Sequence, residues 1–411
     1  MTEQKSLKSL VRERMTRTGE SYTTARRHVT AHAPMAAGSR NLEPGAVADY
    51  SAFGFLEHRP AAQARHMLGA AGINISEPMA CGLGGGVGFM YSIFEYKEVD
   101  HPLLTIVAQH HPMPWLSAVA ENLGLELETL HSSSAAAARK KLDASIDAGT
   151  PALLTVARGL LPHHTGVSAI EVAEPYEVVV AGRRGDDYLV DDLSATPHVL
   201  DGAALATAWA GHRKGRFEMT TLVAASSDKL AVNLEKELPM GVQRAVRMTV
   251  DHLSGPVLGH SYDVNFGFSG MRKLTTELRD RSTKQGWARR FATPAQVSYA
   301  CDRLSECLTS AYTAPGATRP LYAMFLAEAS ALVQAPALAG AAALFAQSGE
   351  DWKALATEAR LQAQANEDRA IHGPEVFSGF ADAVEACVRL EEQAAHLMRE
   401  YLAGTSRPIA G

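Results

Sequence analysis

The sequence has little of what marks several large classes of protein. Its four cysteines are too few and too scattered for a disulfide framework or a cysteine-ligated metal site. It contains no apolar run long enough to cross a bilayer, and its polar, basic start has no hydrophobic segment of the kind found in secretory signals. These absences predict a cytoplasmic protein in a reducing compartment that neither enters nor crosses a membrane.

Charged residues of both signs are moderately frequent, and the way they are distributed along the sequence is more informative about partners than the net charge. The 411 residues carry 39 Lys and Arg against 45 Asp and Glu, and this net charge of −6 argues against general nucleic-acid binding. Residues 1–33 differ, with seven Lys or Arg against three Glu. We therefore predict a basic helical arm over residues 1–33, either solvated or docked on the body, with a nucleic-acid contact or a partner signal as alternatives.

Residues 60–71 form the most clearly delimited of the predicted helices. Pro60 suits the first helical position, and Gly72 supplies the left-handed residue that commonly ends a helix. His58 and Arg59 therefore lie at the helix N-terminus, where the helix dipole favours negative charge. A cation there costs roughly 0.3–1 kcal/mol unless an anionic group faces it. The apolar stripe of this helix consists of Ala64, Met67, Leu68 and Ala71.

Two motifs after this helix suggest known sites but lack the required spacing. The glycine cluster over residues 82–88 fits neither the G-x-G-x-x-G pattern nor a P-loop, so we predict close backbone approach with positive φ angles instead. His110 and His111 could ligate a metal, but no third ligand accompanies them at a useful spacing, and we predict no metal site. No cofactor is implied by either motif.

The order of predicted elements indicates an α+β domain followed by an all-helical one. Strands are predicted over residues 102–108, 152–157, 177–181, 187–190 and 219–223, with helices between them. From about residue 228 helix follows helix, including separate helices over 336–346 and 350–364. The predicted organisation is an arm over 1–33, a linker over 34–52, the α+β domain over 53–225 and the helical domain over 228–403.

Short motifs in both halves of the chain match those of a known family. They are His58, Arg65, Leu68, Gly72, residues 82–89, Leu161-Pro162, residues 178–182, residues 188–191, Tyr322, Phe325-Leu326, Glu328-Ala329 and Trp352. On these motifs the sequence resembles the butirosin biosynthesis protein H family. Residues 56–224 resemble its N-terminal domain, which implies a papain-like fold, and residues 228–360 resemble the helical DUF4872 domain that commonly follows it.

The resemblance implies an activity, the transfer of an acyl group from a carrier-protein thioester to an amine. That chemistry needs a cysteine thiolate at the helix N-terminus, a histidine base and an acid that orients the histidine. The resemblance puts the cysteine position at Arg59 and the acid at Asp191. The histidine position falls at Tyr176, or at Glu177 if the register slips by one. A guanidinium cannot be deprotonated in proteins and is not a nucleophile.

We therefore predict a family member without covalent catalysis that binds an acyl or amine ligand, or a carrier-like partner, in the old cleft. Gly84, Gly85 and Gly86 are predicted to line that cleft. The first alternative is an active acyltransferase with Cys81 as a substitute nucleophile, although a small buried hydrophobic role for Cys81 is the simpler interpretation. The second is a regulator that acts through the basic arm. A homo-oligomer is compatible with each of these predictions.

The reversed charge at the helix N-terminus leads to a specific hypothesis about Arg59. Successive residues of a strand point to opposite faces, so only one of Tyr176 and Glu177 can point toward it. If Glu177 does, its carboxylate pairs with the guanidinium and closes the old nucleophile site. If Tyr176 does, Arg59 is left to receive an anionic ligand such as a carboxylate or phosphate.

Overall fold

The computed structural model of the protein describes residues 43–95, 101–112, 115–165, 175–212, 214, 216–223, 227–369 and 375–405. The predicted arm over residues 1–33 lies outside them, as does the first part of the predicted linker over 34–52. The chain divides into two compact units. The sheet unit comprises Met1–Ile75 and Leu125–Leu230, and the helical unit comprises Ser76–Gly124 and Ala231–Gly411.

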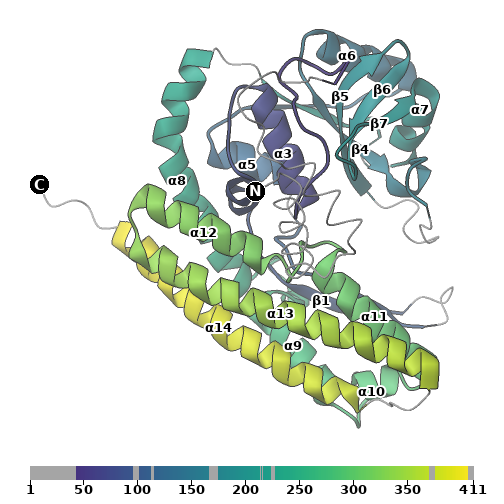
Figure 1. Ribbon diagram of the computed structural model, residues 1–411, viewed down its shortest axis with the longest axis vertical. Helices are drawn as coiled ribbons and strands as arrows, with labels where there is room; N and C mark the ends of the chain where they lie inside the picture. The colour runs from purple at the N-terminus through teal and green to yellow at the C-terminus, as the bar shows by residue number, and fades with distance from the viewer. Residues whose placement is uncertain are drawn as a thin grey trace, which may run out of the picture. The chain divides into compact units, whose positions relative to one another are not determined.

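A six-stranded antiparallel sheet forms the centre of the sheet unit (Figure 1). In spatial order its strands are β3 (Leu127–Leu130), β8 (Met219–Leu222), β4 (Ala152–Ala157), β5 (Pro175–Arg184), β6 (Asp187–Asp191) and β7 (His198–Asp201). Val178, Val179 and Val180 of β5 are all fully buried, although successive residues point to opposite faces. The middle of the sheet is therefore covered on both sides.

Helices α3 (Arg59–Ala70) and α6 (Ala135–Asp147) cover opposite faces of this sheet. The hydroxyl of Tyr188 in β6 donates to Asp143 of α6 at 2.7 Å. Asp191, three residues further along the same strand, contacts His66 of α3. Residues an odd number apart point to opposite faces of a strand, so the two helices cannot share a face. Helix α7 (Gly202–Gly211) packs against α6 and the strands.

The ends of α3 follow from local signals and confirm the predicted helix. His58 is the N-cap, and its ring Nδ1 accepts the Ala61 N–H at 3.3 Å. Pro60 lies in the first turn, where a missing N–H does no harm. Gly72 has a φ of 85°, the left-handed conformation predicted for it.

The strands predicted over 152–157, 177–181, 187–190 and 219–223 are confirmed as β4, β5, β6 and β8. Sequence analysis missed β3 and β7, four-residue edge strands that are largely exposed and so lack a hydrophobic alternation. The strand predicted over 102–108 exists as β2 (Leu103–Val107), but it pairs with β1 (Met90–Phe94) in a separate two-stranded sheet of the helical unit.

The helical unit is built around α13 (Pro336–Arg369), which α11 (Pro294–Thr309), α12 (Arg319–Val333) and α14 (Val376–Thr405) pack against. Helices α13 and α14 run side by side (Figure 1). The separate helices predicted over 336–346 and 350–364 are wrong, because α13 continues through both. The other helices are α4 (Glu77–Leu83), α5 (Trp115–Asn122), most of α8 (Ser227–Ser254), α9 (Gly267–Arg279) and α10 (Trp287–Arg290).

Residues 76–124 pack with the C-terminal helices, so the compact units do not follow the predicted ranges 53–225 and 228–403. A Cβ added at Gly82 of α4 would lie 2.1 Å from the ring of Phe325 in α12. The carbonyls of Gly88 and Ala108 accept hydrogen bonds from Arg319 at the start of α12. These contacts join the segment to the helical unit.

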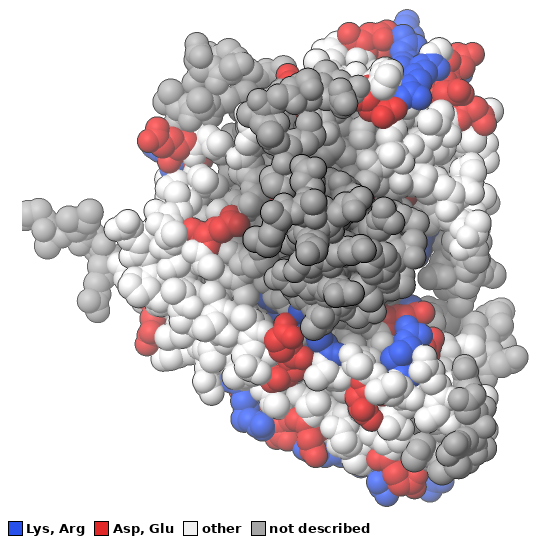
Figure 2. All heavy atoms as spheres, viewed as in Figure 1, with Lys and Arg blue, Asp and Glu red and all other residues white. Residues whose placement is uncertain are grey.

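The surface gives little specific indication of partners. On the face drawn in Figure 2, Lys and Arg side chains are interspersed with Asp and Glu, so the described residues of this face present no broad surface of one sign. None of the described helices combines the length and the apolar character needed to cross a bilayer. The partners and the cytoplasmic location suggested by the sequence stay predictions.

Candidate functional site

The first turn of α3 meets the start of β5 and the end of β6 within the sheet unit. The guanidinium carbon of Arg59 lies 3.9 Å from the centroid of the Tyr176 ring. One of its nitrogens, Nη1, is 3.7 Å from Oδ1 of Asp192, the residue that follows β6. The same nitrogen donates to the backbone carbonyl of Glu177. An aromatic ring, a carboxylate and a carbonyl therefore surround the Arg59 cation.

Arg59 remains a cation in this environment. Burial alone would lower the pKa of Arg59, but Tyr176, Asp192 and Glu177 raise it above its ordinary value. Only 18% of the side chain is exposed. The anionic group that a cation at a helix N-terminus requires is supplied by Asp192.

The structure decides between the two arrangements expected for Arg59. Tyr176 points inward and lies against the guanidinium, whereas Glu177 offers its backbone carbonyl. The predicted ion pair with the Glu177 carboxylate is wrong for the structure, in which the carboxylate that Arg59 approaches is that of Asp192. Burial raises the pKa of Glu177, although the charge of Arg59 lowers it.

Asp191, the predicted orienting acid, is fully buried. Its carboxylate contacts both the segment that precedes α3 and α3 itself. Its Oδ1 accepts the Gly54 N–H at 2.6 Å, and its Oδ2 accepts the Tyr50 hydroxyl at 2.6 Å and lies 2.7 Å from Nδ1 of His66. Arg65 can only donate, so its 3.1 Å contact with Nε2 of His66 leaves a ring proton on Nδ1, facing Asp191. Asp191 thus orients His66, not a residue of β5.

Asp192 gathers a separate set of partners. Its Oδ2 lies 2.8 Å from Nε2 of His163 and 2.8 Å from Nε2 of His164, while its Oδ1 accepts the Tyr176 hydroxyl at 2.7 Å. Burial alone would raise the pKa of Asp192, but these hydrogen bonds and the charge of Arg59 hold it below its ordinary value. Asp192 is therefore the anion at the centre of the site.

His198 of β7 extends this cluster. Its ring stacks on that of His163, with 3.8 Å between centroids and 11° between planes. Nδ1 of His163 and Nε2 of His198 are buried and have no hydrogen-bond partner among the described residues. The sequence analysis selected none of these residues as site candidates: His163, His164, His198 and Asp192. The adjacent doublets His163-His164 and Asp191-Asp192 were the signals available for finding them.

Comparisons with known proteins identify two successive domains along the chain. Residues 58–193 match the family described as butirosin biosynthesis protein H, N-terminal, and residues 213–398 match the domain of unknown function DUF4872. The chain therefore has the two-domain arrangement of a butirosin-H-like protein. No curated protein matches the sequence. Among solved structures, one named as a C39-like peptidase from Bacillus anthracis is similar at 13% identity and a TM-score of 0.31, covering 45% of this chain and 100% of that chain.

These two domain matches confirm the predicted resemblance and support an acyltransferase-related family. The predicted fold class is also confirmed: an α+β, papain-like unit, in which α3 lies with its N-terminus at the ends of antiparallel strands, precedes a series of helices. The resemblance predicts the cysteine position at Arg59 and the histidine position at Tyr176 or Glu177. In the structure the Arg59 guanidinium lies on the Tyr176 ring.

The predicted cleft glycines of the butirosin-H-like domain are packed inside the helical unit instead. Gly85 and Gly86 have φ angles of 107° and 64°, which confirms the predicted left-handed backbone. An added Cβ would lie 2.0 Å from the Trp115 ring at Gly84, 2.6 Å from the His110 ring at Gly85 and 2.3 Å from the Tyr322 ring at Gly86. Side chains of the same unit fill the space beside these three glycines. The glycines therefore allow close packing, and they line no cleft there.

Cys81 lies in α4 of the helical unit and is fully buried. Burial, with a smaller effect from Glu77, raises the pKa of its thiol well above the ordinary value. A nucleophilic cysteine needs the opposite shift. The environment is that of a small buried hydrophobic residue.

Cys81 should therefore react slowly with iodoacetamide at neutral pH in the folded protein, because little thiolate forms and the sulfur is enclosed. Mass spectrometry of the alkylated peptides measures this rate, and the same protein in guanidinium chloride, with all four thiols exposed, is the control. Rapid and selective labelling of Cys81 in the folded protein would contradict this prediction.

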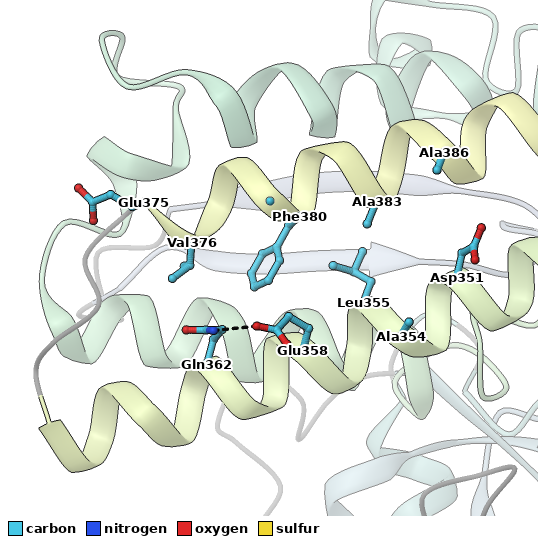
Figure 3. A pocket seen from close by; sticks show the side chains of 11 residues that line it. Asp351, Ala354, Leu355, Glu358, Gln362, Glu375, Val376, Phe380, Ala383 and Ala386 are labelled. Atoms are coloured by element: carbon cyan, nitrogen blue, oxygen red, sulfur yellow. Dashed lines mark hydrogen bonds between the residues drawn. The ribbon is translucent and has the colours of Figure 1, made fainter.

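The helical unit also contains an open groove between α13 and α14, with a volume of about 600 Å³ (Figure 3). Leu355, Val376 and Phe380 give it an apolar surface, and Glu358 accepts a 2.7 Å hydrogen bond from Gln362 within it. The residues that line the groove include no histidine, cysteine, lysine or arginine. The titratable side chains that line it are the carboxylates of Asp351, Glu358 and Glu375, with no thiol or imidazole among them, so the site at α3 remains the candidate for acyl-transfer chemistry.

Proposed function

We propose that this protein binds an acyl or amine ligand, or the carrier that bears the acyl group, at the N-terminus of α3 without forming a covalent intermediate. The observation that carries the proposal is the setting of Arg59, which the resemblance puts at the family's cysteine position: its guanidinium lies on the Tyr176 ring and faces Asp192. A guanidinium offers five N–H donors and no nucleophile. It suits a carboxylate, phosphate or carbonyl oxygen of a ligand, which would compete for it with the 3.7 Å contact to Asp192.

The other members of the catalytic set support the same proposal. All four cysteines of the sequence fall within the ranges of the helical unit, so the sheet unit has no thiol to replace Arg59. Burial raises the pKa of Tyr176 above its ordinary value, so this residue is a neutral phenol at pH 7 and cannot accept a proton there. The site can hold an acyl group by hydrogen bonds, but it lacks the atoms for a thioester intermediate.

Incubation with an acyl N-acetylcysteamine thioester should leave the intact mass of the wild-type protein unchanged, because no activated thiol is available. Intact-protein mass spectrometry measures this result, with Cys81→Ala as the matched control expected to behave identically. An acyl adduct that appears on the wild type and is lost in Cys81→Ala would contradict the proposal. That outcome would favour an active acyltransferase with relocated machinery.

A further inference from the structure

Two imidazoles and a carboxylate converge beside Arg59 in the sheet unit. The donor atoms of His163, His164 and Asp192 lie within 4.8 Å of one another. Nε2 of each histidine is 2.8 Å from the same oxygen, Oδ2 of Asp192. Within the part of the chain that the structure describes, this is the one group of three or more His, Cys, Asp or Glu side chains with such a spacing.

We propose that His163, His164 and Asp192 bind one divalent transition-metal ion of the Zn²⁺ class. Two imidazole nitrogens and one carboxylate oxygen are a common protein donor set for zinc sites that keep a position open for water or a ligand. The sequence analysis expected no metal because it considered only the four cysteines and the His110-His111 pair. This site goes beyond the proposed function and does not rest on it, because metal binding and acylation are measured separately.

The three ligands are held in place by the fold. His163 and His164 lie in a turn that is closed by a 3.0 Å hydrogen bond from the His164 N–H to the Leu161 carbonyl, and the Leu161 side chain is buried. The Asp192 side chain is fully buried, and the side chains of His164 and His163 are 3% and 12% exposed. Ligands fixed by such packing lose little conformational freedom when an ion binds.

Surrounding groups orient these ligands. The Tyr176 hydroxyl donates to Oδ1 of Asp192 and leaves Oδ2 directed at the two histidines. The His198 ring stacks on His163 and fixes the plane of that imidazole. Hydrogen bonds and packing of this kind around metal ligands typically change metal affinity by about 10- to 100-fold.

Two arginines limit the expected affinity. Arg59 lies 3.7 Å from Oδ1 of Asp192, and Nε of Arg158 lies 3.4 Å from Nδ1 of His164. Arginine only donates, so metal on Nε2 of His164 requires the ring proton on Nδ1, and the contact with Arg158 must give way. We therefore expect a dissociation constant on the order of 1 µM, weaker than that of a structural zinc site.

Calorimetric titration of the metal-free protein with ZnCl₂ should show one equivalent bound, and Co²⁺ should give a visible absorption band at the same stoichiometry. His163→Gln and His164→Gln should each weaken Zn²⁺ binding at least about 10-fold, since each removes a direct ligand. His131→Gln is the matched control, because this histidine of the same unit has 60% of its side chain exposed. It should bind Zn²⁺ like the wild type.

The test uses the histidine variants and no Asp192 variant. Asp192 is buried and has several partners, so its replacement is expected to destabilise the fold. Unchanged thermal midpoints without metal show that the variants fold. Arg158→Gln replaces a side chain that can only donate with a neutral one that can also accept, so this variant should bind Zn²⁺ more tightly than the wild type. Absence of saturable binding, or binding that both histidine variants retain in full, would overturn the site. Weaker binding by Arg158→Gln would overturn the assignment of Nε2 of His164 as a ligand.

Discussion

Replacing Arg319 by methionine should lower the free energy of unfolding of the helical unit by about 3–5 kcal/mol. Arg319 and Glu391 are both fully buried, and two hydrogen bonds of 2.9 Å join them. Without the guanidinium, the Glu391 carboxylate would keep only the Ser348 hydroxyl and the Trp352 ring N–H as donors. A buried charge without a counter-charge is strongly destabilising.

Three backbone carbonyls would lose a donor in the same variant. Nη1 of Arg319 donates to the carbonyls of Gly88, Ala108 and Ala317 at 3.0, 2.8 and 2.8 Å. Each buried acceptor left without a partner adds to the loss. This side chain also joins the segment of the butirosin-H-like domain after the glycine cluster to the helices that follow.

Arg279→Met provides the matched control in the same unit. Arg279 is exposed and pairs with Asp382 and Glu385, so its loss should cost about 0–1 kcal/mol. Urea unfolding followed by tryptophan fluorescence measures both variants, because Trp115, Trp287 and Trp352 are buried in the helical unit. Equal losses of stability in the two variants would show that the buried pair contributes no more than a surface pair.

Local signals were sufficient to predict the parts of the fold that depend on neighbouring residues. Pro60 and Gly72 delimit α3 through backbone geometry that each residue dictates by itself. The break predicted between 346 and 350 failed because tertiary contacts override the local preference. The Ser348 hydroxyl donates to buried Glu391, and Gly349 lets Pro320 approach within 2.6 Å of where its Cβ would stand.

The candidate site could be predicted only in part for the same reason. The family resemblance predicted either Tyr176 or Glu177 opposite Arg59, and the structure brings Tyr176 into contact with it. His164 and Asp192 are 28 residues apart in the sequence. One lies in a turn after β4 and the other directly after β6, and no sequence spacing predicts that two such positions are in contact. The sequence analysis named Asp191 as the orienting acid, whereas the carboxylate beside Arg59 in the structure is that of the next residue, Asp192.

Restoring the family's cysteine and histidine should give this protein the ability to accept an acyl group. Arg59→Cys puts a thiol at the start of α3, where the helix dipole lowers a thiol pKa. Tyr176→His puts an imidazole where the Tyr176 hydroxyl now donates to Asp192, so that this carboxylate can orient the new base. The combined variant should react with an acyl N-acetylcysteamine thioester at position 59.

The matched control is Arg59→Cys combined with Tyr176→Phe. It has the same thiol at the same helix terminus but no base beside it. Acylation should then be about 10²–10⁴-fold slower, the usual contribution of a positioned general base. Equal rates in the two variants would mean that Tyr176 does not stand at the position of the catalytic histidine.

Intact-protein mass spectrometry of the wild type, the Arg59→Cys/Tyr176→His variant and its Tyr176→Phe counterpart, after the same exposure to the thioester, is the most direct measurement. We expect an unmodified wild type, a single acyl group at position 59 in the first variant and far less in the second. A wild type that takes up an acyl group while the folded first variant stays unmodified would contradict the account.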